Sequence, residues 1–202
     1  MTVSSGVAHL CTPDSAEATL WAWPCHCTTP LRWFRDLPDD GNRYETVHGE
    51  LLGTPALRAW HQVIVQRVGN RLDRYLQEHT VGFPFHSPAD ISWGTDILVQ
   101  PDLFVVEMEQ ARTMDWTKMR RLLLTIEILS PTTARYDRHT KRRLYQEVGI
   151  PLYWIVDPEK KLVEVWTPED QFPKVERERV KWKPEGAEEE FVLDLEELFE
   201  PI

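Results

Sequence analysis

The chain has 202 residues, enough for one domain with its own core, and it carries a formal net charge of −10. This charge argues against a general nucleic-acid binder, because affinity for phosphate comes mostly from lysine and arginine. The longest apolar runs are far shorter than the roughly 20 residues of a membrane-spanning helix, and the first basic residue is Arg32, too late for a signal peptide. We therefore expect a cytoplasmic protein that has no membrane partner.

The start of the chain differs in composition from the rest. It mixes Ser, Thr and Pro without hydrophobic periodicity, so we expect a poorly ordered extension at 1–30 and a single domain at 31–202. All three cysteines lie in this extension, and an odd number at one end is no disulfide framework, which fits a reducing compartment. Cys25-His26-Cys27 lacks the spacing and the second ligand pair of a structural zinc site. We therefore do not assign a zinc ion to it.

The first part of the domain predicts one extended segment, one long helix and a series of strands. The extended segment runs from Arg43 to Leu52, after a turn cluster at 38–42. From Leu57 to His79, apolar residues recur every three or four positions, which predicts a helix with one buried face. Short apolar runs then predict strands at 81–85, 89–93, 97–99, 103–107 and 122–129.

A second helix is expected from about Arg135 to Val148. The hydroxyls at 130–133 can cap its N-terminus, and Gly149 ends its pattern. The succession of strand, helix and strand over 122–156 is the crossover unit of an α/β sheet, so we expect an α/β fold. Further strands are expected at 152–156 and 162–166, with a short strand or helix at 191–199.

Two acids lie inside apolar, strand-like runs. Asp102 follows Pro101 between two such runs, and Glu127 lies within Leu122–Leu129. A carboxylate in a buried strand is costly unless it is paired or bound to a cation. Hydrolysis of a phosphodiester is helped by a divalent cation that carboxylates hold. We therefore expect Asp102 and Glu127 to be catalytic and to bind Mg²⁺, with the carbonyl of Ile128 as a further oxygen ligand.

A lysine and a basic helix surround this candidate site. Lys141 lies on the helix that follows Glu127, where it could orient or deprotonate water or stabilise the charge of the transition state. Asp137 lies one helical step earlier, so the two side chains share a face. Between positions 112 and 143 there are nine basic residues and three acids, which predicts contacts with DNA. The candidate DNA-binding residues are Arg135, Arg138 and Arg142.

Several short motifs occur in a specific order between about 38 and 167. They are Arg43-Tyr44-Glu45, Gly49-Glu50-Leu51, His61, Pro101-Asp102, Glu127-Ile128-Leu129-Ser130-Pro131-Thr132, Asp137, Lys141, Tyr145 and Tyr153-Trp154-Ile155-Val156-Asp157-Pro158. In this order they resemble the Uma-two family, whose members are grouped with the PD-(D/E)xK nuclease superfamily. The resemblance implies a restriction-endonuclease-like core, a mixed sheet flanked by helices, and an endonuclease that cuts DNA with Mg²⁺ or Mn²⁺.

The resemblance also implies roles for individual residues. Asp102 and Glu127 match the superfamily's acids, but Leu129 stands two residues after the second acid, where the general pattern has lysine. In this family the lysine looks displaced to the following helix, at Lys141. Glu50 resembles the additional acid that completes the metal site. His61, Asp137 and Tyr145 are its expected supporting residues, and His48 stands where the family more often has an acid.

Each role has a structural alternative. Asp102 could cap a turn, Lys141 could belong to a solvated helix face, and His61 is more often a satisfied core histidine. The whole protein could also be a catalytically silent nuclease-fold protein with a nucleic-acid-binding or regulatory role, which its acidic charge favours. An RNA or nucleotide hydrolase is a weaker alternative. Cutting both strands of DNA usually takes two sites, so a homodimer would suit the nuclease.

Overall fold

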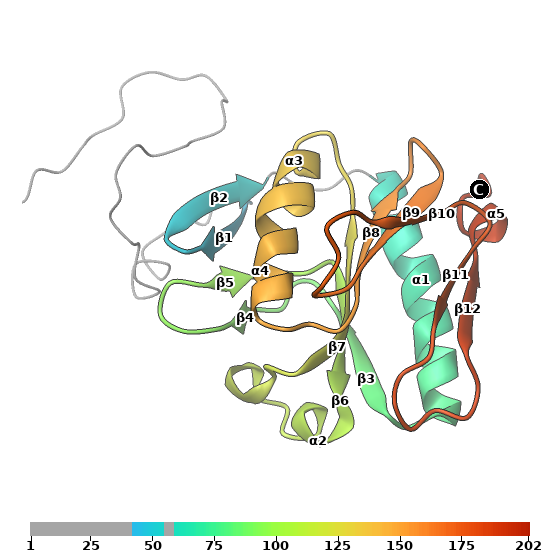
Figure 1. Ribbon diagram of the computed structural model, residues 1–202, viewed down its shortest axis with the longest axis horizontal. Coiled ribbons are helices and arrows are strands. Elements are labelled where there is room, and N and C mark those ends of the chain that lie inside the picture. The colour runs from blue at the N-terminus through green and yellow to red at the C-terminus, as the bar shows by residue number, and fades with distance from the viewer. Residues whose placement is uncertain (1–41, 55–58) are drawn as a thin grey trace, which may run out of the picture.

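The computed structural model describes residues 42–54 and 59–202 (Figure 1). The extension expected at 1–30, with its Cys25-His26-Cys27 triplet, and the domain start expected at 31 lie outside the described residues. Within the described ranges, no helix has the length and apolar character that a bilayer crossing would require.

A six-stranded mixed sheet forms the centre of the molecule. Its strands β7 (Leu122–Ile128) and β8 (Tyr153–Asp157) are parallel, and every other neighbouring pair is antiparallel. The helical segment between β7 and β8 is therefore the crossover that the sequence predicts. In spatial order the strands are β10 (Lys174–Glu176), β9 (Leu162–Trp166), β8 (Tyr153–Asp157), β7 (Leu122–Ile128), β6 (Leu103–Glu107) and β3 (Gly82–His86).

The segment expected to be extended from Arg43 to Leu52 is instead a hairpin of β1 (Arg43–Val47) and β2 (Glu50–Thr54). His48 and Gly49 form its turn with φ values of 49° and 80°. Two successive residues with positive φ are typical of the turn that joins two-residue hairpins. With β5 (Leu98–Val99) and β4 (Ile91–Ser92), the hairpin makes a four-stranded sheet in the order β2-β1-β5-β4.

The long helix α1 (Ala59–Glu78) confirms the amphipathic pattern. Its buried face packs on the six-stranded sheet, and the hairpin of β11 (Arg179–Trp182) and β12 (Phe191–Asp194) joins the same core (Figure 1). The expected edge element at 191–199 is both strand and helix, because α5 (Leu195–Leu198) follows β12 directly. The sequence did not predict β10, β11, the short helix α2 (Met108–Ala111) or the 3₁₀ turn η2 (Trp116–Lys118).

The second helix is continuous but not uniform. It consists of α3 (Ala134–Tyr136), the π-helical turn η3 (Asp137–Lys141) and α4 (Arg142–Glu147), and it ends at Gly149 with φ of 75°. The helix expected at 135–148 is thus confirmed in extent, while its π turn was not predicted. Such turns carry one extra residue, and they occur often at functional sites.

The central sheet is buried on both faces, which explains the nearly continuous apolar runs of β6, β7 and β8. Leu124, Ile126 and Ile128 of β7 belong to the core that α1 covers. Because side chains alternate along a strand, Glu127 points to the opposite face. There the helical segment α3–α4 and the four-stranded sheet lie over the sheet (Figure 1), and they enclose the candidate site.

Candidate active site

Asp102 lies directly before β6 and is held at three points. Its Oδ2 lies 2.9 Å from Nε2 of His61 and accepts a 2.9 Å hydrogen bond from the backbone N–H of Ile128. Its Oδ1 lies 3.4 Å from the guanidinium of Arg43. Burial alone would raise the pKa of Asp102, but the bond and charge of His61 outweigh it, with help from Arg43 and Lys141. The pKa is therefore below its ordinary value, and Asp102 is a carboxylate.

His61 reaches Asp102 from α1 and is 5% exposed. Its Nδ1 has no hydrogen-bond partner in the described part of the chain, so the interaction with Asp102 is the polar contact of this ring. Because Asp102 is ionised, Nε2 carries the proton in that contact. His61 therefore orients one oxygen of Asp102.

Lys141 lies at the centre of three carboxylates on the other side of the site. Its Nζ is 2.8 Å from Oε1 of Glu127 and 2.8 Å from Oε1 of Glu45. Asp137, one helical step away, contributes Oδ1 at 3.8 Å. All four side chains are buried. We call Glu45, Glu127, Asp137 and Lys141 the lysine cluster.

Three acids surround one base in the lysine cluster. Burial raises the pKa of Glu127 well above its usual range; the charge of Lys141 lowers it, and the neighbouring carboxylates raise it. For the same reasons the pKa of Asp137 is raised to about 7. Burial opposes the charge of Lys141 as well, but Glu127 and Glu45 outweigh it and raise its pKa well above the ordinary value. Lys141 is therefore a stable ammonium.

Tyr145 joins the lysine cluster to α4. Its hydroxyl donates a 3.0 Å hydrogen bond to Oε1 of Glu127, the oxygen that also receives Lys141. The ring is fully buried and meets Tyr153 edge to face, with 4.8 Å between ring centroids. Burial raises the pKa of Tyr145 well above its ordinary value, and the charge of Glu127 raises it further. Tyr145 is thus a neutral donor that fixes Glu127.

Glu45 is the site residue that the sequence analysis did not assign. It is 4% exposed, and besides Lys141 its Oε1 accepts a 2.6 Å hydrogen bond from the backbone N–H of Gln100. Alternation along β1 gives a signal that could have found it, since Glu45 lies two residues before the buried Val47. Glu50, the third acid expected from the resemblance, is exposed at the start of β2.

The expected DNA-binding arginines point away from the lysine cluster. Arg138 is paired with Asp157 and with Glu164 of β9, at 2.8 Å each. The guanidinium of Arg142 lies 4.9 Å from the ring centroid of Trp166. Arg135 is exposed. The helical segment therefore has an inner side with Asp137 and Lys141 and an outer side that is basic.

The donors suit a hard divalent cation, because they are carboxyl oxygens and the acids of the site outnumber Lys141 and Arg43. Asp102 and Glu127 are close, since the backbone N–H of Asp102 lies 3.4 Å from Oε2 of Glu127. Among the residues described, however, no three acids, histidines or cysteines are grouped as a metal site. Here the cationic groups of Lys141 and Arg43 contact the carboxylate oxygens. The donor chemistry thus fits the ion, and binding would require these cations to move.

Comparison with known families assigns the chain to one of them. The Uma2 family model, described as "Putative restriction endonuclease", matches residues 32–199. The chain belongs to the Uma2 family. This confirms the family that its motifs resemble, and residue 32 extends the match upstream of the position 38 from which the resemblance was drawn.

One solved structure has a fold similar to that of this chain. It is the crystal structure of a putative nuclease belonging to DUF820 from Anabaena variabilis, with a TM-score of 0.70 and 23% sequence identity. The match covers 85% of this chain and 97% of that chain. At this identity the likeness shows the fold, a mixed sheet with few helices. No curated protein matched the chain.

Proposed function

We propose that this Uma2 protein is a metal-dependent endonuclease that hydrolyses phosphodiester bonds of DNA. The observation that carries the proposal is the meeting of Asp102, Glu127 and Lys141 in one buried site from three separate elements. Buried ionisable groups with shifted pKa values are typical of active sites. Family membership supports this reaction class, since the model that the chain matches is described as "Putative restriction endonuclease".

Asp102 and Glu127 are the proposed metal ligands. A Mg²⁺ or Mn²⁺ ion bound there would supply positive charge beside the phosphate and a water of lowered pKa. His61 and the backbone N–H of Ile128 both bind Oδ2 of Asp102. Oδ1 is therefore the oxygen of this carboxylate that can change its partner. For the third acid we favour Glu45 over Glu50, because Glu45 is buried beside Lys141 whereas Glu50 is exposed.

Lys141 acts in this proposal as a fixed positive charge. Its raised pKa argues against the deprotonation of water, which needs a neutral amine. An ammonium can instead stabilise the negative charge that develops on the phosphate oxygens, and this effect is strong in a dry site. Asp137 and Tyr145 position Lys141 and Glu127 respectively.

One observation favours a second candidate, a nuclease-fold protein that binds or regulates without cutting. Basic side chains of the chain itself already contact both acids, Lys141 on Glu127 and Arg43 on Asp102. A site neutralised in this way could be structural. Calorimetry decides between the two candidates, because only the nuclease requires Mg²⁺ or Mn²⁺ binding that depends on Asp102 and Glu127.

The decisive test is cleavage of DNA with Mg²⁺ or Mn²⁺ by the wild type, Asp102→Asn and Glu127→Gln. Both substitutions keep the shape of the side chain and remove its charge, so cleavage should be lost while the fold persists. Glu188→Gln changes an exposed acid by the same charge and should cut as the wild type does. Equal residual cleavage by all four proteins would point to a contaminating nuclease and would overturn the proposal.

A further inference from the structure

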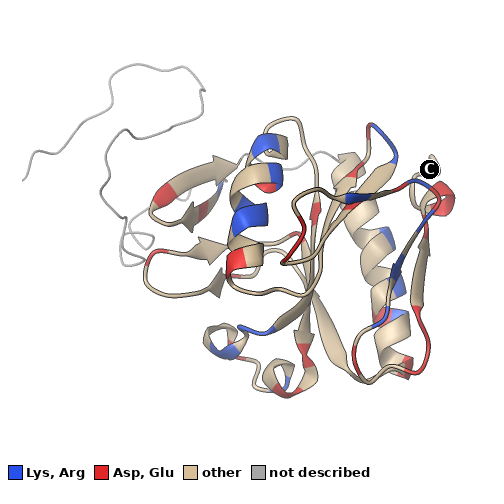
Figure 2. Ribbon diagram, in the orientation of Figure 1, with Lys and Arg blue, Asp and Glu red and all other residues tan. Residues whose placement is uncertain are grey.

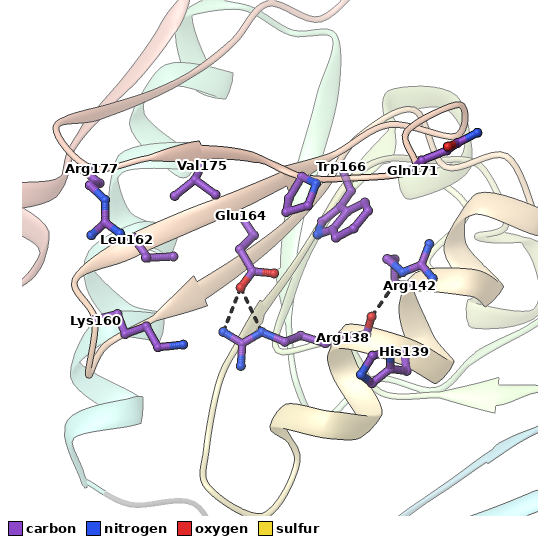
Figure 3. Close-up of a pocket in the computed structure, with 11 residues that line it drawn as sticks. Arg138, His139, Arg142, Lys160, Leu162, Glu164, Trp166, Gln171, Val175 and Arg177 are labelled. Atoms are coloured by element: carbon purple, nitrogen blue, oxygen red, sulfur yellow. Dashed lines mark hydrogen bonds and ion pairs between the residues drawn. The ribbon is translucent and has the colours of Figure 1, made fainter.

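A basic groove of about 500 Å³ lies between the outer side of the α3–α4 segment and strands β9 and β10 (Figure 3). It is separate from the lysine cluster, whose residues do not line it. The overall charge of the chain is −10, so a concentration of positive side chains is unusual on this molecule. Its basic lining residues are Arg138, His139, Arg142, Lys160 and Arg177.

The floor of the groove comes from alternate residues of β9, which share one face of the strand. Leu162 and Trp166 are buried and apolar, and Glu164 lies between them. Glu164 does not leave the floor negative, because Arg138 donates a 2.8 Å hydrogen bond to it. Glu164 and Asp157 are thus set against Arg138 and Lys160, and Arg142 and Arg177 still leave the groove with an excess of positive charge.

Two of the arginines are held in place before any ligand arrives. Arg138 is fixed by Glu164 and Asp157. Arg142 lies over the Trp166 ring, and its guanidinium donates to Gln146 at 2.7 Å. A guanidinium has five N–H donors, so these contacts leave donors over for a ligand. Fixed cations lose less conformational entropy on binding than mobile ones.

The remaining basic groups lie at both ends of the groove. Figure 3 shows Lys160 and Arg177 on one side of the Arg138–Glu164 pair, and His139 and Arg142 on the other. Lys160, Arg177 and His139 are exposed. Cations spread along an open groove fit a ligand that carries several separated negative charges, whereas a single small anion would need them to converge on one point.

We propose that this groove binds successive backbone phosphates of DNA. The choice of DNA rests on the proposed function, because Asp137 and Lys141 occupy the inner side of the helix whose outer side forms the groove. DNA carries one charge per about 3.4 Å of each strand, which matches a row of cations better than a compact anion does. Figure 2 shows that Lys and Arg recur along this helix. In this way the groove binds the DNA backbone at a distance from the phosphodiester bond that is cut.

The test is DNA binding without cleavage, by fluorescence anisotropy of a labelled duplex in EDTA at several salt concentrations. The double variant Lys160→Gln with Arg177→Gln removes two exposed groove cations. Each lost phosphate contact should reduce the magnitude of the slope of log affinity against log salt concentration by about 1. The slope of this double variant should therefore be smaller than the wild-type slope by about 2. Arg179→Gln with Lys183→Gln makes the same charge change at exposed residues outside the groove and should keep the wild-type slope.

The outcomes separate this groove from the proposed function. A groove variant that keeps the wild-type slope, an equal loss in the control variant, or a wild type that does not bind DNA would each overturn the groove. Groove-dependent binding by a wild type that never cuts with Mg²⁺ or Mn²⁺ would support the groove and overturn the nuclease. Cleavage that depends on Asp102 but not on Lys160 and Arg177 would support the nuclease and overturn the groove.

Discussion

The ammonium of Lys141 separates carboxylates that would otherwise repel one another in a buried space. It lies 2.8 Å from both Glu127 and Glu45, and the side chain is 3% exposed. A buried ion pair adds little net stability, but removal of one partner leaves uncompensated charge. Lys141 therefore has a structural role besides the catalytic one proposed for it, and the two roles require different measurements.

Lys141→Met should reduce the free energy of unfolding by about 3–5 kcal/mol, because it leaves three buried acids without their base. Urea unfolding at slightly alkaline pH measures this loss. Arg143→Met, an exposed neighbour on the same helix, is the matched control and should change stability by about 0.5 kcal/mol or less. A loss for Lys141→Met no larger than that of the control would contradict the lysine cluster as described.

Asp137 makes stability depend on pH in a defined direction. Burial, with repulsion from neighbouring carboxylates, raises its pKa from 3.8 to about 7. Between these values the native state keeps a proton that the unfolded chain has released, so stability falls as pH rises from about 4 to 7 and is level above. Asp137→Asn cannot titrate. Unfolding curves across this range should therefore show the wild type losing stability relative to Asp137→Asn, and parallel curves would refute the shift.

At the scale of elements, the π turn η3 sets which residues of the helix face the site. The five residues Asp137–Lys141 place Asp137 and Lys141 inward, while Arg138 faces β9. An extra residue in one turn changes the register between α3 and α4. The turn thus lets one helix pack Leu144 and Tyr145 in the core and still direct Asp137 to Lys141.

Deletion of Thr140 should return this turn to α-helical register and separate Asp137 from its place in the site. We expect far-UV circular dichroism to keep its helical signal while metal-dependent DNA cleavage falls at least tenfold. Thr140→Ala retains the register and should cut normally. If the deletion variant cuts as well as Thr140→Ala, the π turn does not matter for the site.

The sequence predicted the strand that carries Glu127 and the strand that begins directly after Asp102, because an acid within or beside an apolar run is conspicuous. The helix of Lys141 was also predicted, but its π turn was not, since apolar spacing of three and four residues is the same with and without one extra residue. Glu45 was missed because its partner lies far along the chain, and only the register of β1 brings them together. Contacts of this kind follow from tertiary packing and not from local pattern.

Of the C-terminal hairpin, the strand β12 lies within the element expected at 191–199, whereas β11 was not expected. In β11 and β12 the inward residues Val180, Trp182, Phe191 and Leu193 alternate with charged or exposed ones. The many charged residues of this region concealed that alternation in β11. The hairpin nevertheless covers the core beside α1, so the acidic end of the chain contributes to the fold.

At the scale of the whole molecule, the site is closed between two layers and contains more acidic groups than basic ones. An ion that binds the native state alone stabilises it, by about 2.7 kcal/mol at one hundred times its dissociation constant. Thermal unfolding of the wild type should therefore shift upward with Mg²⁺ or Mn²⁺. Asp102→Asn and Glu127→Gln should lose this shift and Glu188→Gln should keep it; equal shifts in all variants would mean that the ion binds elsewhere.

The most direct test of the proposed active site is the anomalous diffraction of crystals soaked in Mn²⁺. We predict a manganese peak in contact with the carboxylates of Asp102 and Glu127, with Arg43 moved off Oδ1 of Asp102. Such a peak would join the two acids in one metal site, as the nuclease requires. An anomalous map without manganese at these two carboxylates, from crystals in which the ion binds elsewhere or not at all, would contradict it.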